Sequence, residues 1–181
     1  MYGLVNKAIE DMVLQKFGAA TWEEIKRRAG VDVDVFISME GYPDEITYNL
    51  VDAASDVLNM SKPIILQEFG RFWVMFTGKT AYGPLLNPAG STMKECLLNL
   101  DQLHLQVGLA LPDLAPPSFS VIDVSVDTFK VRYKSERKVL APMVVGLLVG
   151  LGELYDEPVS VTMDEIDSID TLNTTFTVKY I

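Results

Sequence analysis

Residues 129–137 of the chain read FKVRYKSER, and this stretch decides the fold class. Phe129, Val131 and Tyr133 alternate with basic residues, which is the two-residue period of a strand with one buried face. Similar patterns predict strands over 118–126, 158–163 and 174–180, with a turn at Asp127-Thr128 and an acidic turn region before the last strand. The last third of the chain is therefore predicted to form a small antiparallel sheet of about four strands.

The first two-thirds of the chain is predicted to be helical, because its apolar residues recur every three or four positions. Gly18 follows the first helix as a stop signal, and Pro63 lies in the first turn of another helix, after Ser61 as its cap. Thr21 and Glu24 form a capping-box pattern for a short helix. The expected helices cover residues 5–17, 21–30, 44–60, 61–76, 93–111 and 139–155, with a turn-rich stretch over 83–90.

The composition fits one folded α+β domain over 1–181, with a helical lobe over 1–60 and a second lobe over 61–181. The net charge of −10 excludes the clustered basic surface that nucleic acids require. The longest apolar run, 139–151, contains one proline and two glycines and is shorter than the roughly 20 residues that cross a bilayer. With Cys96 as the only cysteine and no secretory leader pattern at the start, we expect a cytoplasmic protein.

His104, the only histidine, lies on an apolar face of the predicted 93–111 helix. Leu97, Leu100, Val107 and Leu111 share its three- and four-residue spacing, which places all five on one side. Two interpretations stay open at this point. The residue is either a core histidine whose ring nitrogens bond to neighbours, or an axial ligand that presents neutral imidazole to a haem iron.

Three residues with hydrogen-bond donors stand at the end of the predicted strand over 129–135 and just beyond it. Residues two apart in an extended segment share a face, so Tyr133, Ser135 and Arg137 project together. A phenol, a hydroxyl and a guanidinium suit an anionic ligand such as a pair of haem propionates. The alternative is an amphipathic strand whose polar end is solvated.

The sequence contains none of the common catalytic signatures, such as GxGxxG, GxxxxGK[ST], GxSxG or HExxH. Its carboxylate pairs fall in predicted surface or turn positions. We therefore expect a binding protein and not an enzyme. Trp73 and Met143 either line a small-molecule pocket or simply pack in the core.

Taken together, these residues resemble the haem nitric oxide/oxygen-binding (H-NOX) family, which is related to the haem domain of soluble guanylate cyclase. The chain opens with MYGLVN over 1–6, which is similar to the opening of that family. His104-Leu105-Gln106 stands where the family has its proximal histidine, and Pro116-Pro117 stands where a family proline presses on the porphyrin. Tyr133, Ser135 and Arg137 match the Tyr-x-Ser-x-Arg motif of the family.

The resemblance implies a role for each of these residues. It implies haem b, buried between the helical part and the sheet, with His104 as the iron ligand. Tyr133, Ser135 and Arg137 would bind the propionates, and Pro117 would pack on the macrocycle. Further haem contacts are expected at Leu100, Trp73, Met143, Val5, Ile9 and Val144.

The distal side suggests which gas is sensed. Family members that hold oxygen stably have a distal tyrosine on the helix after the motif, whereas residues 139–147 contain none, and Pro142 or Met143 takes its place. The resemblance thus implies a sensor of nitric oxide and carbon monoxide that excludes oxygen. Release of His104 would move its helix. The signalling partner would act in trans and would be a histidine kinase or a cyclic-dinucleotide enzyme; no contact with nucleic acid or a membrane is expected.

Two other classes of protein stay open on the residues alone. A haem-free module that buries a fatty acid would use Arg137 to bind the ligand carboxylate. A haem enzyme of the peroxidase type would need distal acid and base groups, but the only histidine, His104, is already assigned to the proximal side.

Overall fold

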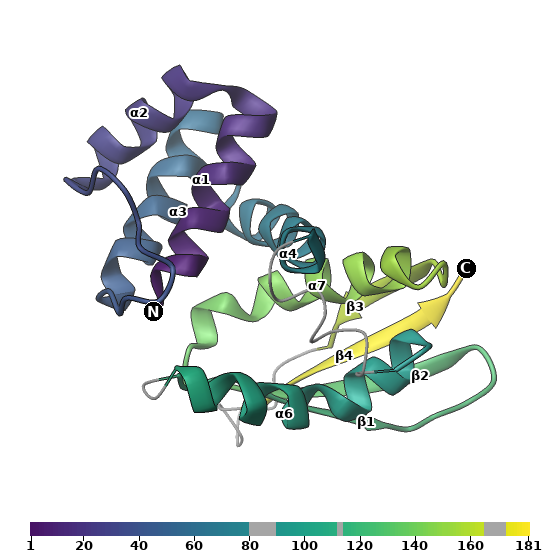
Figure 1. Cartoon of the computed structure of the whole chain (residues 1–181). Coiled ribbons are helices and arrows are strands. Elements are labelled where there is room, and N and C mark those ends of the chain that lie inside the picture. Colours follow the sequence, from purple (N-terminus) through teal and green to yellow (C-terminus); the bar gives the residue numbers. More distant parts are fainter. Residues whose placement is uncertain (80–89, 112–113, 165–172) are drawn as a thin grey trace. The chain divides into compact units, whose positions relative to one another are not determined.

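The computed structural model of the chain describes residues 1–79, 90–111, 114–164 and 173–181 (Figure 1). These residues form six α-helices, one 3₁₀ turn and a four-stranded antiparallel sheet, which confirms the predicted α+β class. The chain divides into two compact units, Met1–Phe69 and Gly70–Ile181. Most of the predicted 83–90 turn and most of the acidic turn region before the last strand lie outside the described residues. No helix in the described ranges is long and apolar enough to span a membrane.

The first unit consists of α1 (Gly3–Phe17), α2 (Ala19–Ala29), α3 (Asp44–Leu58) and the start of α4 (Lys62–Lys79). Gly18 ends α1 with a φ of 85°, which glycine adopts without steric cost, and α2 follows at once. The capping-box prediction at Thr21 is wrong for this reason. Gly18 holds the cap position, while Thr21 lies inside α2 and its hydroxyl donates to the Phe17 carbonyl at 2.9 Å. Gly30 ends α2, as predicted, with a φ of 66°.

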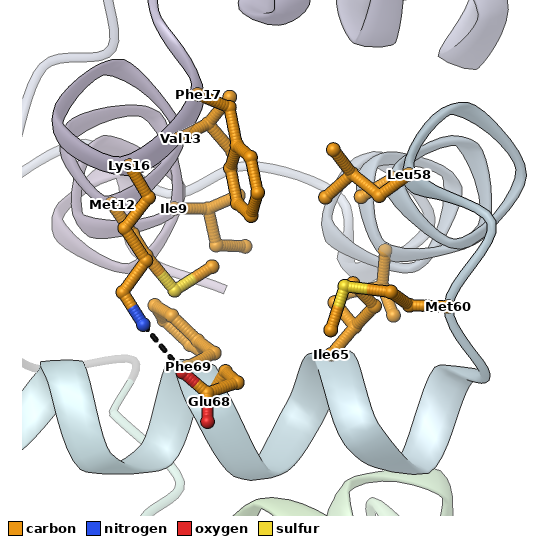
Figure 2. Close-up of a pocket in the computed structure, with 12 residues that line it drawn as sticks. Ile9, Met12, Val13, Lys16, Phe17, Leu58, Met60, Ile65, Glu68 and Phe69 are labelled. Carbon is orange, nitrogen blue, oxygen red and sulfur yellow. Dashed lines mark hydrogen bonds and ion pairs between the residues drawn. The ribbon is translucent and has the colours of Figure 1, made fainter.

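The interior of the first unit is mostly apolar, with Asn6 and Thr47 as buried polar residues, and it contains a small apolar pocket among α1, α3 and α4 (Figure 2). The start of α1 is packed tightly, because a Cβ atom at Gly3 would lie 2.2 Å from the Ile37 carbonyl oxygen. The Gly3 N–H donates to the Glu40 carbonyl at 2.8 Å. Close backbone packing therefore gives a structural reason for the glycine in the MYGLVN opening.

The second unit is built on a sheet with the strand order β1-β2-β4-β3, all antiparallel. The strands are β1 (Ser118–Ile122), β2 (Thr128–Lys134), β3 (Val159–Met163) and β4 (Asn173–Tyr180). β1 ends at Ile122, before the predicted Val126, because the chain has already turned. Asp123 has a positive φ of 49°, and the Ser125 N–H donates to the Thr128 carbonyl at 2.8 Å. Thr128, predicted as part of the turn, is the first residue of β2.

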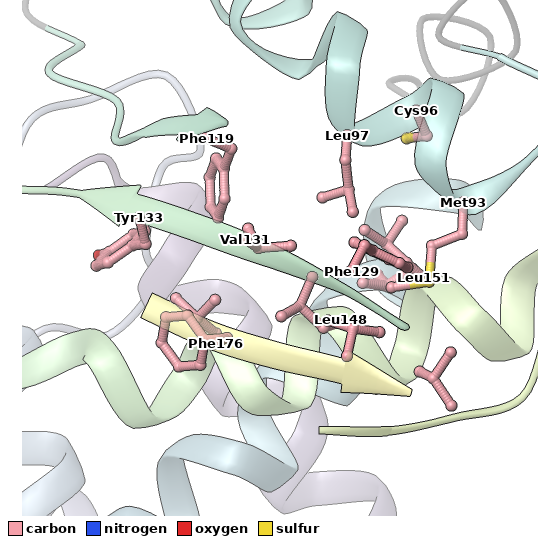
Figure 3. Packing of buried hydrophobic residues seen from close by; sticks show 14 of the residues in the cluster. Met93, Cys96, Leu97, Phe119, Phe129, Val131, Tyr133, Leu148, Leu151 and Phe176 are labelled. Atoms are coloured by element: carbon pink, nitrogen blue, oxygen red, sulfur yellow. The ribbon is translucent and has the colours of Figure 1, made fainter. Parts of the chain in front are cut away.

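Two helices of the second unit share one hydrophobic core with the sheet (Figure 3). They are α6 (Met93–Ala110) and α7 (Ala141–Leu154), the latter preceded by the 3₁₀ turn Lys138–Leu140. Phe129, Val131 and Phe176 point from the strands into this core, together with Leu97 of α6 and Leu148 of α7. Each large side chain buried in this way contributes about 1.5–3 kcal/mol, so the alternation of residues 129–133 fixes which face of β2 receives the helices.

Candidate haem site

His104 lies in the second half of α6, whose position on the sheet is fixed by a carboxylate one helical turn earlier. Asp101 accepts a hydrogen bond of 2.6 Å from the Ser118 hydroxyl and one of 3.0 Å from the Phe119 N–H. The His104 ring then lies beside the Phe119 ring, with 6.4 Å between the centroids. Asp101 is a residue that sequence reasoning missed, because its partners are on a different element.

The surroundings of His104 favour neutral imidazole. Burial lowers its pKa below the ordinary 6.5, and the Asp101 charge and the Pro117 backbone oppose this shift. Nδ1 is buried and has no hydrogen-bond partner among the described residues. A buried polar atom without a partner costs about 1–3 kcal/mol, whereas a core histidine of the structural kind normally has its nitrogens bonded. Neutral imidazole is the form that binds iron, and the ligand role of His104 stays a prediction.

The predicted apolar face of α6 is present, but its residues are buried to different extents. Leu97 and Leu111 are buried, whereas Leu100 and Val107 are half-buried. The opposite face of the helix carries exposed leucines that sequence reasoning did not single out: Leu98, Leu105 and Leu109.

Tyr133, Ser135 and Arg137 come together at the end of β2, as their spacing predicted. Tyr133 is 5% exposed and packs on Phe119, with ring centroids 5.3 Å apart. Burial raises its pKa, against a hydrogen bond with Ser135 and the charge of Arg137. The Ser135 hydroxyl also accepts a 3.1 Å bond from the Arg137 N–H. The three groups therefore form one polar cluster at an apolar wall.

Pro117 lies in the short connection between α6 and β1, and Arg137 bonds to the same connection. Arg137 Nη1 donates to the Ala115 carbonyl at 2.9 Å. Pro117, two residues further on, is half-buried, and its backbone lies beside the His104 ring, while Pro116 is exposed. The structure thus brings the predicted iron ligand, the predicted propionate ligands and the predicted packing proline into one place.

The predicted distal residues of the second unit lie where α4 and α7 cross. A Cβ atom at Gly70 would lie 2.1 Å from the Met143 carbonyl oxygen, so the two helices touch through their backbones. Trp73 and Met143 are half-buried beside this crossing, and Pro142 is also half-buried. Val144 is 1% exposed and belongs to the core shared with the sheet. Gly70 is a second residue that sequence reasoning missed.

Val5 and Ile9 belong to α1 of the first unit. Ile9 is buried and lines the apolar pocket of that unit, and Val5 is half-buried. Their contact with a haem stays a prediction. Elsewhere, the described part of the chain has no cluster of three or more His, Cys, Asp or Glu side chains that could hold a metal ion.

Comparison with known proteins relates the chain to soluble guanylate cyclases. Soluble guanylate cyclase gcy-31 of Caenorhabditis elegans is 27% identical over 168 residues, and soluble guanylate cyclase 89Db of Drosophila melanogaster is 23% identical over 155 residues. The alignments cover 92% and 86% of this chain but only 24% and 23% of these relatives, so the chain spans about a quarter of their length.

The fold is also that of solved H-NOX structures. The H-NOX protein from S. oneidensis in the Fe(II)NO ligation state superposes with a TM-score of 0.87 at 19% identity, over 100% of this chain and 99% of that one. The Fe(II) unliganded H-NOX protein from K. algicida gives a TM-score of 0.83 at 19% identity, over 100% and 97%. The sequence model of the haem-NO-binding family matches residues 2–163. The chain therefore belongs to the haem-NO-binding (H-NOX) family of haem-based gas sensors.

Proposed function

We propose that residues 1–181 form a single sensor domain that responds to nitric oxide and carbon monoxide and excludes oxygen. Its helical lobe would cover 1–60 and its haem-ligating lobe 61–181. The observation that supports haem ligation most directly is His104, whose pKa is lowered by burial and whose buried Nδ1 has no partner among the described residues. Haem b, when bound, would supply a ferrous iron with a free position for a diatomic gas. His104 would hold that iron from the protein side.

The propionates would be held by the cluster at the end of β2. Arg137 Nη1 donates to the Ala115 carbonyl at 2.9 Å, which orients the guanidinium, and the planar fork of a guanidinium suits a carboxylate. Burial raises the Tyr133 pKa above its ordinary value of 10.0, so its phenol stays protonated and can donate at neutral pH. Ser135 would hold the Tyr133 side chain and the Arg137 backbone in register, since its hydroxyl bonds the Tyr133 phenol and accepts from the Arg137 backbone N–H.

The gas selectivity that we propose follows from the side chains on the distal side. Pro142, Met143 and Val144 have no O–H or N–H in their side chains, which leaves the Trp73 indole as the donor in this set. We expect the Trp73 indole chiefly to fill space. Oxygen gains most from a hydroxyl donor such as a distal tyrosine, which this set lacks, whereas nitric oxide and carbon monoxide bind ferrous iron without one. A site lined in this way would therefore hold oxygen weakly.

The response that we propose is a movement of α6 against β1 when His104 is released. Such a movement acts on a partner only if the partner distinguishes the two positions of the helix. We propose a separate cytoplasmic protein as that partner, either a histidine kinase or a cyclic-dinucleotide enzyme.

Anaerobic absorption spectra of the ferrous protein test the proposal. We expect a Soret band after reconstitution with haem, changes on adding nitric oxide or carbon monoxide, and no stable new species in air. His104→Gly should lose the proximal ligand, and added imidazole should restore the wild-type spectrum. No Soret band would contradict haem binding, and a stable oxygen complex in air would contradict the selectivity. An unchanged spectrum in His104→Gly would contradict the ligand assignment.

A further inference from the structure

The first unit contains an apolar pocket that shares only Ile9 with the predicted haem contacts. It lies among α1, α3 and α4 and has a volume of about 70 Å³ (Figure 2). Ten of its lining side chains are apolar, among them Ile9, Met12, Leu58 and Met60. In Figure 2 the α1 side chains and the Leu58, Met60 and Ile65 side chains stand on opposite sides of the space.

The two charged groups at this pocket neutralise each other. Lys16 of α1 and Glu68 of α4 form an ion pair at its edge (Figure 2). A paired lysine and glutamate leave no net charge to attract an ionic ligand. The remaining lining atoms are apolar and offer water no hydrogen bonds, and a buried water needs about 2–4 polar partners. The chemistry of the pocket thus excludes ions and disfavours water.

We propose that this pocket binds a small uncharged apolar molecule, independently of haem. One water needs a volume of roughly 10–15 Å³, and a cavity of about 150 Å³ lined by Leu, Ile and Phe accepts benzene or xenon. The pocket, at about 70 Å³, lies between these sizes and suits a molecule of a few heavy atoms. Met12 and Met60 add flexible thioether side chains, which adapt their shape to such a ligand.

Xenon is the probe for this site, used on the haem-loaded ferrous carbon monoxide complex with ¹³C-labelled methionine methyl groups. Met12 and Met60 line the pocket, whereas Met39 and Met163 are exposed and serve as internal controls. Single Met→Leu variants assign the four signals. We expect the Met12 and Met60 signals to shift along a saturating curve as the xenon pressure rises, while the Met39 and Met163 signals stay in place.

Two variants fill the pocket from different positions on α3. If one of them fails to fold, the other still tests the proposal. Ala54→Leu and Leu58→Phe should each abolish the saturating shift, and melting curves check that they are folded. Ala20→Leu adds the same atoms as Ala54→Leu at an exposed position of α2 and should keep the shift. A linear drift of all four signals, no shift at all, or a saturating shift that survives in both filled variants would overturn the proposal.

Discussion

Replacing Asp101 with alanine tests whether one carboxylate holds the His104 helix on the sheet. Asp101 accepts bonds of 2.6 Å from the Ser118 hydroxyl and 3.0 Å from the Phe119 N–H. Hydrogen bonds to a charged group contribute about 1.5–3 kcal/mol each. Because Asp101 is only half-buried, we take the lower end for each bond and expect Asp101→Ala to lower the free energy of unfolding by about 3 kcal/mol.

Urea unfolding followed by circular dichroism measures this change, with the haem concentration held constant because a bound cofactor adds to stability. Ser118→Ala removes one of the two bonds and should cost about 1.5 kcal/mol. Since the Ser118 bond is lost only once when both residues are changed, the double variant should show a coupling of about 1–1.5 kcal/mol. Loss of the Asp101 charge should also lower the His104 pKa further, because that charge raises it in the native protein.

Two outcomes would refute this reasoning. The first is a loss of less than about 1 kcal/mol in Asp101→Ala, which would mean that water replaces both bonds at no cost. The second is strict additivity of Asp101→Ala and Ser118→Ala, which would mean that the two side chains act independently. Asp101→Asn is the matched control, because it keeps an acceptor oxygen and removes the charge, and we expect about half of the alanine effect.

Three further predictions use the same structure. The lowered pKa of His104 means that the unfolded chain takes up a proton near pH 6.5 and the folded chain only below that. The free energy of unfolding of the cofactor-free protein should therefore fall as the pH drops below 6.5, and urea titrations of His104→Gln should lack this part of the slope. Gly70→Ala should lower the free energy of unfolding by about 1–3 kcal/mol, because the added Cβ would meet the Met143 backbone. Gly78→Ala has open space around the added Cβ and should raise the free energy of unfolding by up to about 1 kcal/mol. Equal melting temperatures of the two variants would contradict this. Arg137→Lys should speed haem transfer to apomyoglobin about tenfold or more. A lysine lacks the planar guanidinium that could bond the Ala115 carbonyl and a carboxylate at the same time. An unchanged transfer rate would contradict the propionate role.

Local patterns predicted most of the fold, because they report on short-range physics. The alternation of Phe129, Val131 and Tyr133 placed β2 and its buried face correctly. The errors came where two local signals competed. The capping pattern at Thr21 was misleading because Gly18 both ends α1 and begins α2, and β1 was predicted too long because Ser125 bonds back to Thr128.

The site was predictable only as far as its residues are close in sequence. The spacing of Tyr133, Ser135 and Arg137 was enough to predict that they converge. Asp101 and Gly70 could not be found in this way, because each depends on a partner from a distant part of the chain. A glycine inside a helix looks like a weak point in the sequence, and only the Met143 backbone 2.1 Å from its Cβ position explains Gly70.

The short connection before β1 links three parts of the site, namely Arg137, His104 and Asp101. The Ala115 carbonyl accepts the Arg137 guanidinium, Pro117 lies beside His104, and Ser118 bonds Asp101 on the His104 helix. Pro116 and Pro117 restrict the backbone in between, so this segment has little freedom to absorb a displacement. A shift of α6 would therefore also change the bond between Arg137 and Ala115. In the same way, a displacement of the proposed propionate ligands would change the position of His104. The iron ligation and the propionate binding that we propose should therefore respond together and not as independent events.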